Sequence, residues 1–249
     1  MNVYKADLHN HTILSPCGDI EMTPAFIVNA AVERGLDIVG VTDHNSTLQC
    51  KEICDIARRK GSPFVLCGAE VTSKEEVHCV VFVDGEEKLR VLQNYLSLNL
   101  PKIKNDVDVF GYQLLVNEKE EIVGEEEYLL ISAISQNISQ IATFVHSLGG
   151  VFIPAHIDKM QNSVISQLGF LPPDLKVDAL ELSKRVREDE FISKNKYLSS
   201  YNFIRSSDAH YREDFAVGCT FFYMEELTFD EIKMALHREN GRYTEICYE

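Results

Sequence analysis

Several features that would assign this chain to a special class of protein are missing from its sequence. No apolar stretch is long enough to cross a membrane, and residues 1–7 contain no hydrophobic signal region. No Gly/Ser linker, internal repeat or low-complexity tract interrupts the 249 residues. These absences exclude export and membrane insertion and leave a globular cytoplasmic protein as the expectation.

The cysteines lack the pattern of a disulfide-rich or zinc-ribbon domain. There are seven of them, an odd number at irregular spacings, and no paired Cys-x-x-Cys elements. A reducing compartment is the environment that suits such a set of thiols, which again favours the cytoplasm.

Basic residues are scarce. The chain has 24 Lys and Arg against 39 Asp and Glu, for a formal net charge of -15. Binding to duplex DNA or to an anionic membrane depends on clustered Lys and Arg, so neither is expected as a partner. Bound divalent cations would offset the charge locally, so a small phosphorylated substrate remains compatible with it. The sequence leaves the oligomeric state open.

What the sequence does contain is an alternation of β-rich runs and amphipathic stretches, which predicts an α/β fold of strand–helix units around a parallel sheet. The predicted strands are 3–8, 37–42, 63–67, 77–83, 150–154, 178–182, 201–206 and 219–222. The predicted helices are 24–34, 48–60, 86–98, 132–148, 163–168, 188–198 and 229–238. Only the stretch from 101 to 127, with its acidic run, breaks the alternation. It is either a solvated hairpin or loop, or a flap that shapes substrate choice.

Nine residues that readily bind metal ions stand mostly at the ends of the predicted strands. They are His9, His11, Asp19, His44, Glu70, His78, His156, Asp208 and His210. The carboxyl ends of strands in a barrel open on one face, where these side chains could converge on divalent ions. Because they extend from residue 9 to residue 210, a single domain of residues 1–249 is favoured over two small ones.

Three local patterns strengthen the metal interpretation. His9 and His11 are two residues apart, so on a strand they share a face, and Asp208 and His210 repeat that spacing. Glu70 ends an apolar run, where a buried carboxylate is costly without a cation or strong donors. Each pattern also has an ordinary explanation, since surface histidines pair by chance and Asp208 could cap a helix.

The ordered blocks resemble the PHP (polymerase and histidinol phosphatase) domain phosphoesterases over roughly residues 5–215. The blocks are Asp7-Leu-His-Asn-His-Thr12, Gly40-Val-Thr-Asp-His44, Gly68-Ala-Glu70, His78, Pro154-Ala-His156 and Ser207-Asp-Ala-His210. The resemblance implies a distorted (β/α)7 barrel with a trinuclear centre of zinc, manganese or iron at the C-terminal ends of the strands. The whole chain would be one PHP domain, with an insertion or flap at about 101–131.

The resemblance also implies how the ligands divide among the ions. His9, His11, Glu70 and Asp208 would surround the first, and Glu70, His78 and His156 the second. Asp19, His44 and His210 would surround the third. The Cys17-Gly-Asp19 turn departs from the commoner Ser-Asp-Gly, so Cys17 is an alternative to Asp19 near that ion.

The expected chemistry is hydrolysis of a phosphate ester by a hydroxide that bridges two ions, without a covalent phosphoenzyme. Lys184, Arg185 and Arg187 follow a predicted strand and are candidates to bind the phosphoryl group, unless they form a solvated helix start. Asp43 is a candidate for a supporting or proton-transfer role. The substrate would be a small molecule, a nucleotide or a short oligonucleotide.

Two other functions are consistent with the same residues. An amidohydrolase also begins with His-x-His, but it expects a bridging Lys on a middle strand where this chain offers Glu70. A non-catalytic metal-binding interaction module would be expected to have lost ligands, yet all nine positions hold ligand-type residues. The phosphoesterase is therefore preferred.

Overall fold

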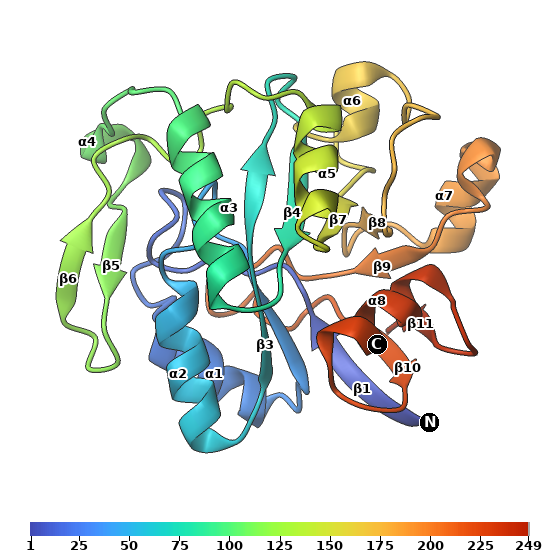
Figure 1. Cartoon of the computed structure of the whole chain (residues 1–249), viewed down its shortest axis with the longest axis horizontal. Coiled ribbons are helices and arrows are strands. Elements are labelled where there is room, and N and C mark those ends of the chain that lie inside the picture. Colours follow the sequence, from blue (N-terminus) through green and yellow to red (C-terminus); the bar gives the residue numbers. More distant parts are fainter. Residues whose placement is uncertain (249) are drawn as a thin grey trace.

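The fold centres on a seven-stranded sheet in a computed structural model that describes residues 1–248 (Figure 1). Its strands run in the order β11-β10-β1-β2-β3-β4-β7. Their bounds are β1 Asn2–Asp7, β2 Ile38–Val41, β3 Phe64–Thr72, β4 His78–Phe82, β7 Val151–Pro154, β10 Thr220–Met224 and β11 Tyr243–Ile246. Strands β8 (Leu180–Leu182) and β9 (Phe203–Arg205) form a separate parallel pair. All eight predicted strands are present.

The large sheet is mixed, whereas the alternation of elements predicted parallel strands. Strands β1, β2 and β3 are parallel neighbours, but β4 is antiparallel to β3, β7 to β4 and β10 to β1. The reason at β3 and β4 is that only residues 73–77 separate them, which is enough for a hairpin and too short for a crossover helix. The curled α/β sheet agrees with the PHP-type fold that the sequence indicated.

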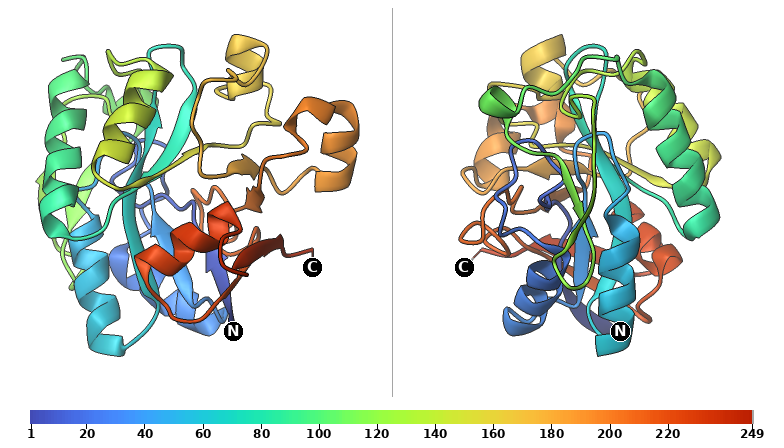
Figure 2. Two further views of the ribbon diagram at one scale, coloured as in Figure 1. Left: turned by 45° about the vertical axis from the view of Figure 1, so that its right-hand side comes forward. Right: turned by 90° about the vertical axis from the view of Figure 1, so that its left-hand side faces the viewer.

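Helices cover the sheet and bury its apolar side chains. Their bounds are α1 Pro24–Glu33, α2 Cys50–Lys60, α3 Glu86–Asn99, α5 Ile138–Ser147, α6 Val164–Leu168, α7 Glu188–Lys194 and α8 Phe229–His237. Helices α2, α3 and α5 lie along one side of the sheet, as two further views show (Figure 2). Within residues 1–248, no helix combines the length and apolar character needed to span a bilayer.

Local signals explain most helix boundaries. Thr23 accepts a hydrogen bond from the Phe26 amide and Pro24 opens the first turn, so α1 begins where the sequence predicted. Helix α5 begins at Ile138, six residues later than predicted, because Asn137 and Gln140 form a reciprocal capping box. The predicted helix 188–198 divides into α7 and a 3₁₀ turn, η1 (Lys196–Leu198).

The 101–131 segment contains a short helix, α4 (Val107–Phe110), and a hairpin of β5 (Leu114–Val116) with β6 (Ile122–Glu125). Figure 1 shows this hairpin at the edge of the molecule, apart from the main sheet. Gln113 is fully buried and ties the segment together, because its side-chain amide donates to the carbonyls of Glu126 and Tyr128 and accepts from the Leu130 amide.

Strand alternation determines which side chains of β3 face the functional site. Ala69 and Val71 belong to the core that β3 and β4 share with α3 and α5. The intervening Glu70 therefore points to the opposite face, because successive residues of a strand alternate. The Glu70 carboxylate thus lies at the end of the sheet where the loops after β1, β2, β7 and β9 meet.

Candidate metal centre

The strands and the loops that follow them bring eight of the nine predicted ligands together at one end of the sheet. His9 and His11 follow β1, His44 follows β2, His156 follows β7, and Asp208 and His210 follow β9. His78 begins β4, but the hairpin reverses the chain, so the start of β4 lies beside the end of β3. Loops that are distant in sequence also hydrogen-bond here, since the His11 amide donates to Ala209 and the Asn45 amide to Glu70.

Glu70 is the centre of the cluster and is only 1% exposed. Five imidazole nitrogens lie within 3.4 Å of its two oxygens: His9 Nε2, His78 Nδ1 and His156 Nε2 beside Oε1, and His11 Nε2 and His44 Nδ1 beside Oε2. Burial favours the neutral acid, but the surrounding histidines hold the pKa of Glu70 well below its usual range. Glu70 is therefore the anionic hub of the site.

The spacing of four donor groups fits the shell of a single cation. His9 Nε2 and His11 Nε2 are 3.3 Å apart, and Asp208 Oδ1 lies 3.4 Å and 3.5 Å from them. Glu70 Oε1 is 3.3 Å from His9 Nε2 and Oε2 is 3.4 Å from His11 Nε2. Ligand atoms about 2.1 Å from a tetrahedral cation are about 3.4 Å from one another. These side chains therefore suit a metal ion without rearrangement.

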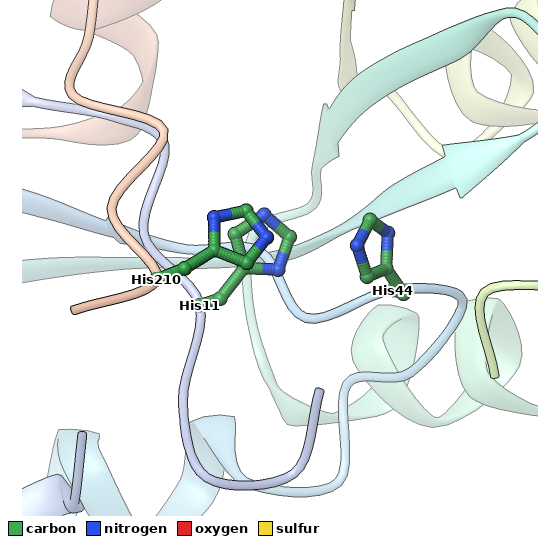
Figure 3. A group of neighbouring side chains, drawn as sticks. All are labelled: His11, His44 and His210. Carbon is green, nitrogen blue, oxygen red and sulfur yellow. The ribbon is translucent and has the colours of Figure 1, made fainter. Parts of the chain in front are cut away.

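Two further groups share members with the first. His44, Glu70 and His78 form one, and His11, His44 and His210 form the other, each with its ligand atoms within 4.8 Å of one another. Figure 3 shows the three imidazoles of the last group on three separate segments of the chain, and the rings of His11 and His210 stack with centroids 4.0 Å apart. The overlapping groups indicate a polynuclear metal site.

Protonation also favours ligation at these histidines. Burial lowers the pKa of His44 to about 4 and of His210 to about 3, so both imidazoles are neutral at pH 7 and able to bind a cation. His44 Nδ1 lies 3.0 Å from Glu70 Oε2 but is not aligned for a hydrogen bond, and it has no other partner among the described residues. A buried nitrogen left unpaired beside a carboxylate fits a site for a cation.

Glu181 supports the cluster and was not among the predicted site residues. Its carboxylate lies 3.0 Å from His9 Nδ1 and accepts the His156 amide at 3.0 Å. An ionised carboxylate can only accept, so His9 Nδ1 carries a proton and Nε2 is the nitrogen that would bind a cation. The available signal was a carboxylate between Leu180 and Leu182 in an apolar strand, the same signal that singled out Glu70.

Asp43 acts on the cluster through Ser15. Asp43 accepts hydrogen bonds from the Thr12 amide and hydroxyl at 2.7 Å and 2.8 Å, and from the Ser15 hydroxyl at 2.7 Å. Ser15 Oγ in turn accepts from His11 Nδ1 at 2.9 Å, which leaves His11 Nε2 free to bind metal. Asp43 therefore positions His11, and its predicted role in proton transfer stays a prediction.

Two of the candidate ligands have a strained backbone. His156 has φ 31° and Asp208 has φ 51°, a left-handed conformation that costs free energy for side chains other than glycine. The loop that carries Asp208 is held by Asp7, which accepts the Ser207 amide at 2.9 Å and the Ala216 amide at 3.0 Å. Strain that the surrounding contacts enforce is typical of functional sites.

Asp19 is not in any of the three ligand groups. Its amide donates to the His210 carbonyl at 2.8 Å, but its carboxylate accepts the Glu21 amide. Neither Asp19 nor the exposed Cys17 is thus brought among the ligand atoms, although both line a hollow beside them. The assignment of Asp19 to a third ion stays a prediction.

A hollow of about 300 Å³, here called the metal-centre hollow, opens beside the cluster. Its lining includes His156, Asp208 and His210 together with Lys159, Lys184, Arg185 and Tyr211. Lys184 pairs with Asp214 at its edge, and Lys159, which was not among the predicted residues, contacts Asp208 directly. Lys159, Lys184 and Arg185 thus line the hollow beside the metal site, where an anionic group would approach.

Arg187 is not part of that hollow. Its Nε lies 3.2 Å from Asp189 Oδ1, and its guanidinium lies over the Tyr248 ring at 4.8 Å from the centroid. Of the three predicted phosphate-binding residues, the structure places Lys184 and Arg185 at the metal site and Arg187 beside the C-terminal segment.

Comparisons with known proteins find relatives in sequence and in fold. YqxK of Bacillus subtilis, an uncharacterised protein, is 24% identical over 267 residues, with 95% of this chain and 62% of YqxK covered. Endonuclease Q, solved with a 27-mer duplex substrate bearing an abasic lesion, superposes with a TM-score of 0.75 at 20% identity, over 97% of this chain and 58% of that one. This chain therefore spans about three fifths of the length of both.

A third similar protein is of nearly the same length. A protein from Bifidobacterium adolescentis, classed provisionally as a metal-dependent phosphoesterase, superposes with a TM-score of 0.58 at 21% identity, over 94% of this chain and 96% of that one. At these identities the superpositions establish the fold alone. The family model for the PHP domain matches residues 7–198, which carry seven of the nine predicted ligands, and the chain therefore belongs to the PHP domain family.

Proposed function

We propose that this chain is a metal-dependent phosphoesterase with a trinuclear centre. The observation that carries the proposal is the spacing of His9 Nε2, His11 Nε2, Asp208 Oδ1 and the Glu70 carboxylate, which matches the shell of one cation. Two more ligand groups overlap with it, one through Glu70 and the other through His11, and these two groups share His44 with each other. Nitrogen and oxygen donors in this mixture suit zinc, manganese or iron.

The ligands divide among three ions with two changes from the sequence expectation, since His44 is added at the second ion and His11 at the third. His9, His11, Glu70 and Asp208 would hold the first, and Glu70 with His78, His156 and His44 the second. His11, His44 and His210 would hold the third, with Asp19 as a further candidate. Ions bound there would lower the pKa of a coordinated water and neutralise charge on a phosphoryl group.

The protein's own residues would orient both partners in the reaction. Glu181 and Ser15 fix the rings of His9 and His11, and so fix the direction of the lone pairs in the site. Lys159, Lys184 and Arg185 line the metal-centre hollow and would bind the phosphate by charge-assisted hydrogen bonds. No nucleophilic side chain is required, because water is the attacking group.

We infer that the substrate is a phosphate ester of a small molecule, a nucleotide or a short oligonucleotide. Cleavage of duplex DNA is a second candidate, because the fold superposes on endonuclease Q. The formal charge of -15 opposes broad electrostatic binding of a duplex by this chain.

An amidohydrolase is disfavoured because the central strand β3 presents Glu70, and not the Lys that such a site requires. We expect the protein in the reducing cytoplasm, since its seven cysteines are an odd number at irregular spacings, which is not the pattern of a disulfide framework.

The test combines metal analysis with a panel of phosphomonoesters and phosphodiesters, assayed with manganese, zinc and iron. Wild type should hold more than one equivalent of metal and hydrolyse at least one ester. Glu70→Gln and His156→Ala should lose metal and activity, whereas Glu87→Gln, which alters an exposed carboxylate on α3, should behave as wild type. Full hydrolysis by both site variants would show the metal mechanism to be wrong, and a metal-loaded wild type inert on every ester would identify a non-catalytic module.

A further inference from the structure

Two hollows meet at Tyr211. One is the metal-centre hollow, and the other, also about 300 Å³, is here called the tyrosine hollow. Tyr211 lines both, so the two hollows are neighbours. A ligand with its phosphate among Lys159, Lys184 and Arg185 could therefore place another part of itself in the tyrosine hollow.

The tyrosine hollow differs in chemistry from its neighbour. Its lining includes Ile13, Pro16, Ile20, Tyr112 and Tyr211, and the one charged side chain among its described lining residues is Asp19. Tyr112 is 55% exposed and Tyr211 is 48% exposed, so both present ring surface to solvent. They come from different parts of the chain, Tyr112 from the 101–131 segment and Tyr211 from the loop after His210. Tyrosines offer a flat apolar body with a polar tip, which suits a planar, partly polar group.

The backbone on both sides of this hollow is fixed. Next to Tyr112, the buried Gln113 makes three hydrogen bonds within its segment, and the Leu114 amide donates to the Ile13 carbonyl at 3.3 Å. Next to Tyr211, the His210 carbonyl accepts the Asp19 amide, and the Asp214 amide donates to the Tyr211 carbonyl. The backbone that carries the two tyrosines is therefore fixed, which reduces the entropy lost on binding.

We propose that the tyrosine hollow binds a nucleobase of the substrate, by stacking on Tyr112 and Tyr211, while the phosphate occupies the metal-centre hollow. This inference rests on the proposed phosphoesterase function and narrows its substrate to esters that carry a heteroaromatic ring. Stacking on exposed aromatic side chains accepts any base, because every base has a π-face. The subsite would therefore favour nucleotides over other phosphate esters without reading a sequence.

The first experiment measures binding and is independent of hydrolysis. The chain has no Trp, so Tyr112→Trp creates a single tryptophan, which can be excited selectively over the tyrosines, inside the tyrosine hollow. Adenosine, which has no phosphate to cleave, should quench its fluorescence with saturation, and ribose 5-phosphate should not. The matched control is Tyr197→Trp, at a tyrosine on η1 that is 53% exposed. Equal quenching of both variants by adenosine, or quenching of neither, would overturn the proposal.

The second experiment measures specificity. The ratio of kcat/KM for AMP to that for ribose 5-phosphate should fall roughly tenfold in Tyr112→Leu and return in Tyr112→Phe, because the ring is what stacks. If the protein is a phosphodiesterase, the same ratio is measured for thymidine 5′-(4-nitrophenyl phosphate), which carries a base, and methyl 4-nitrophenyl phosphate, which does not. Tyr197→Leu should leave the ratio as in wild type. An unchanged ratio in Tyr112→Leu would overturn the proposal, whereas a wild type inert on all four esters would refute the phosphoesterase and leave the fluorescence test to decide on the hollow.

Discussion

At the scale of single residues, Glu181 orients two candidate metal ligands without being a ligand itself. Its carboxylate accepts hydrogen bonds from His9 Nδ1 and from the His156 amide. Glu181→Gln keeps the shape but removes the charge from these hydrogen bonds, so metal affinity should fall about 10- to 100-fold. Titration with zinc against a competing chelator measures this, and circular dichroism confirms that the fold is retained. The prediction is wrong if Glu181→Gln binds zinc as tightly as the exposed-site control Glu87→Gln.

Lys159 has two opposing effects on the same site. Burial works against its charge, but Asp208, which it contacts, raises the pKa of Lys159, so it is an ammonium at pH 7. Lys159→Met should lower kcat/KM for a phosphate ester about 10- to 100-fold, because a charged hydrogen bond contributes about 1.5–3 kcal/mol. The same variant should bind metal more tightly, because a cation that competes for Asp208 is gone.

Lys159→Arg separates the two effects, because it keeps the charge and should recover part of the activity. Inhibition by inorganic phosphate gives a second measurement, since its Ki should rise in Lys159→Met and not in Lys159→Arg. A Lys159→Met enzyme with an unchanged Ki for phosphate would leave Lys159 with a purely structural role.

Much of the cluster could be predicted residue by residue, because ligand types stand where strands end. His9, His11, Glu70, Asp208 and the other histidines of the site were found in this way. Glu181 and Ser15 were not, since their importance depends on which ring nitrogen faces them in space. Lys159 was missed because its contact with Asp208 joins loops 49 residues apart.

At the scale of elements, the strands were predictable because their apolar runs are short and clearly bounded. For residues 101–127 the sequence offered a solvated hairpin or loop, or a flap, but not the positions of β5 and β6, because the packing there is mostly polar: Ile122 and Val123 are both 65% exposed, whereas Gln113 is fully buried. The pairing of β4 was also hidden, since strand direction depends on the length of the connection, and residues 73–77 contain no strong turn signal. Hydrophobic periodicity reports burial and leaves such polar anchoring undetected.

Asp178 connects several elements and is not a member of the candidate ligand groups. It is 6% exposed and lies 2.9 Å from His146 Nε2 on α5 and 2.7 Å from His237 Nε2 on α8, and it accepts the Phe152 amide of β7. Burial opposes ionisation, but these partners, His146 first, lower the pKa of Asp178 below its ordinary value of 3.8. The fold thus gives His146 and His237, which are 91 residues apart in the sequence, a shared partner.

Replacing this carboxylate gives a stability difference whose pH dependence has a definite sign. Asp178→Asn should lower the free energy of unfolding at pH 7 by about 1–3 kcal/mol, because hydrogen bonds to a buried charge are weakened. A depressed pKa contributes stability above pH 3.8 that is lost as the pH falls through the folded-state value. Urea unfolding from pH 7 downward should therefore show the difference shrinking only below about pH 4. Asp55→Asn, at an exposed ion pair, should show little difference at any pH.

At the scale of the whole molecule, the candidate ligands join loops from residue 9 to residue 210, so bound metal would cross-link nearly the entire chain. A ligand at 100 times its Kd stabilises the folded state by about 2.7 kcal/mol, and 1 kcal/mol shifts the Tm of a chain this long by about 2–4 °C. Saturating divalent metal should therefore raise Tm by roughly 5–10 °C over the EDTA-treated protein, as differential scanning calorimetry can measure. Glu70→Gln should lose this shift because the shared hub is gone, while Asp178→Asn, remote from the site, should melt lower yet keep it. A shift of equal size in Glu70→Gln would mean that the metal stabilises the protein from another site.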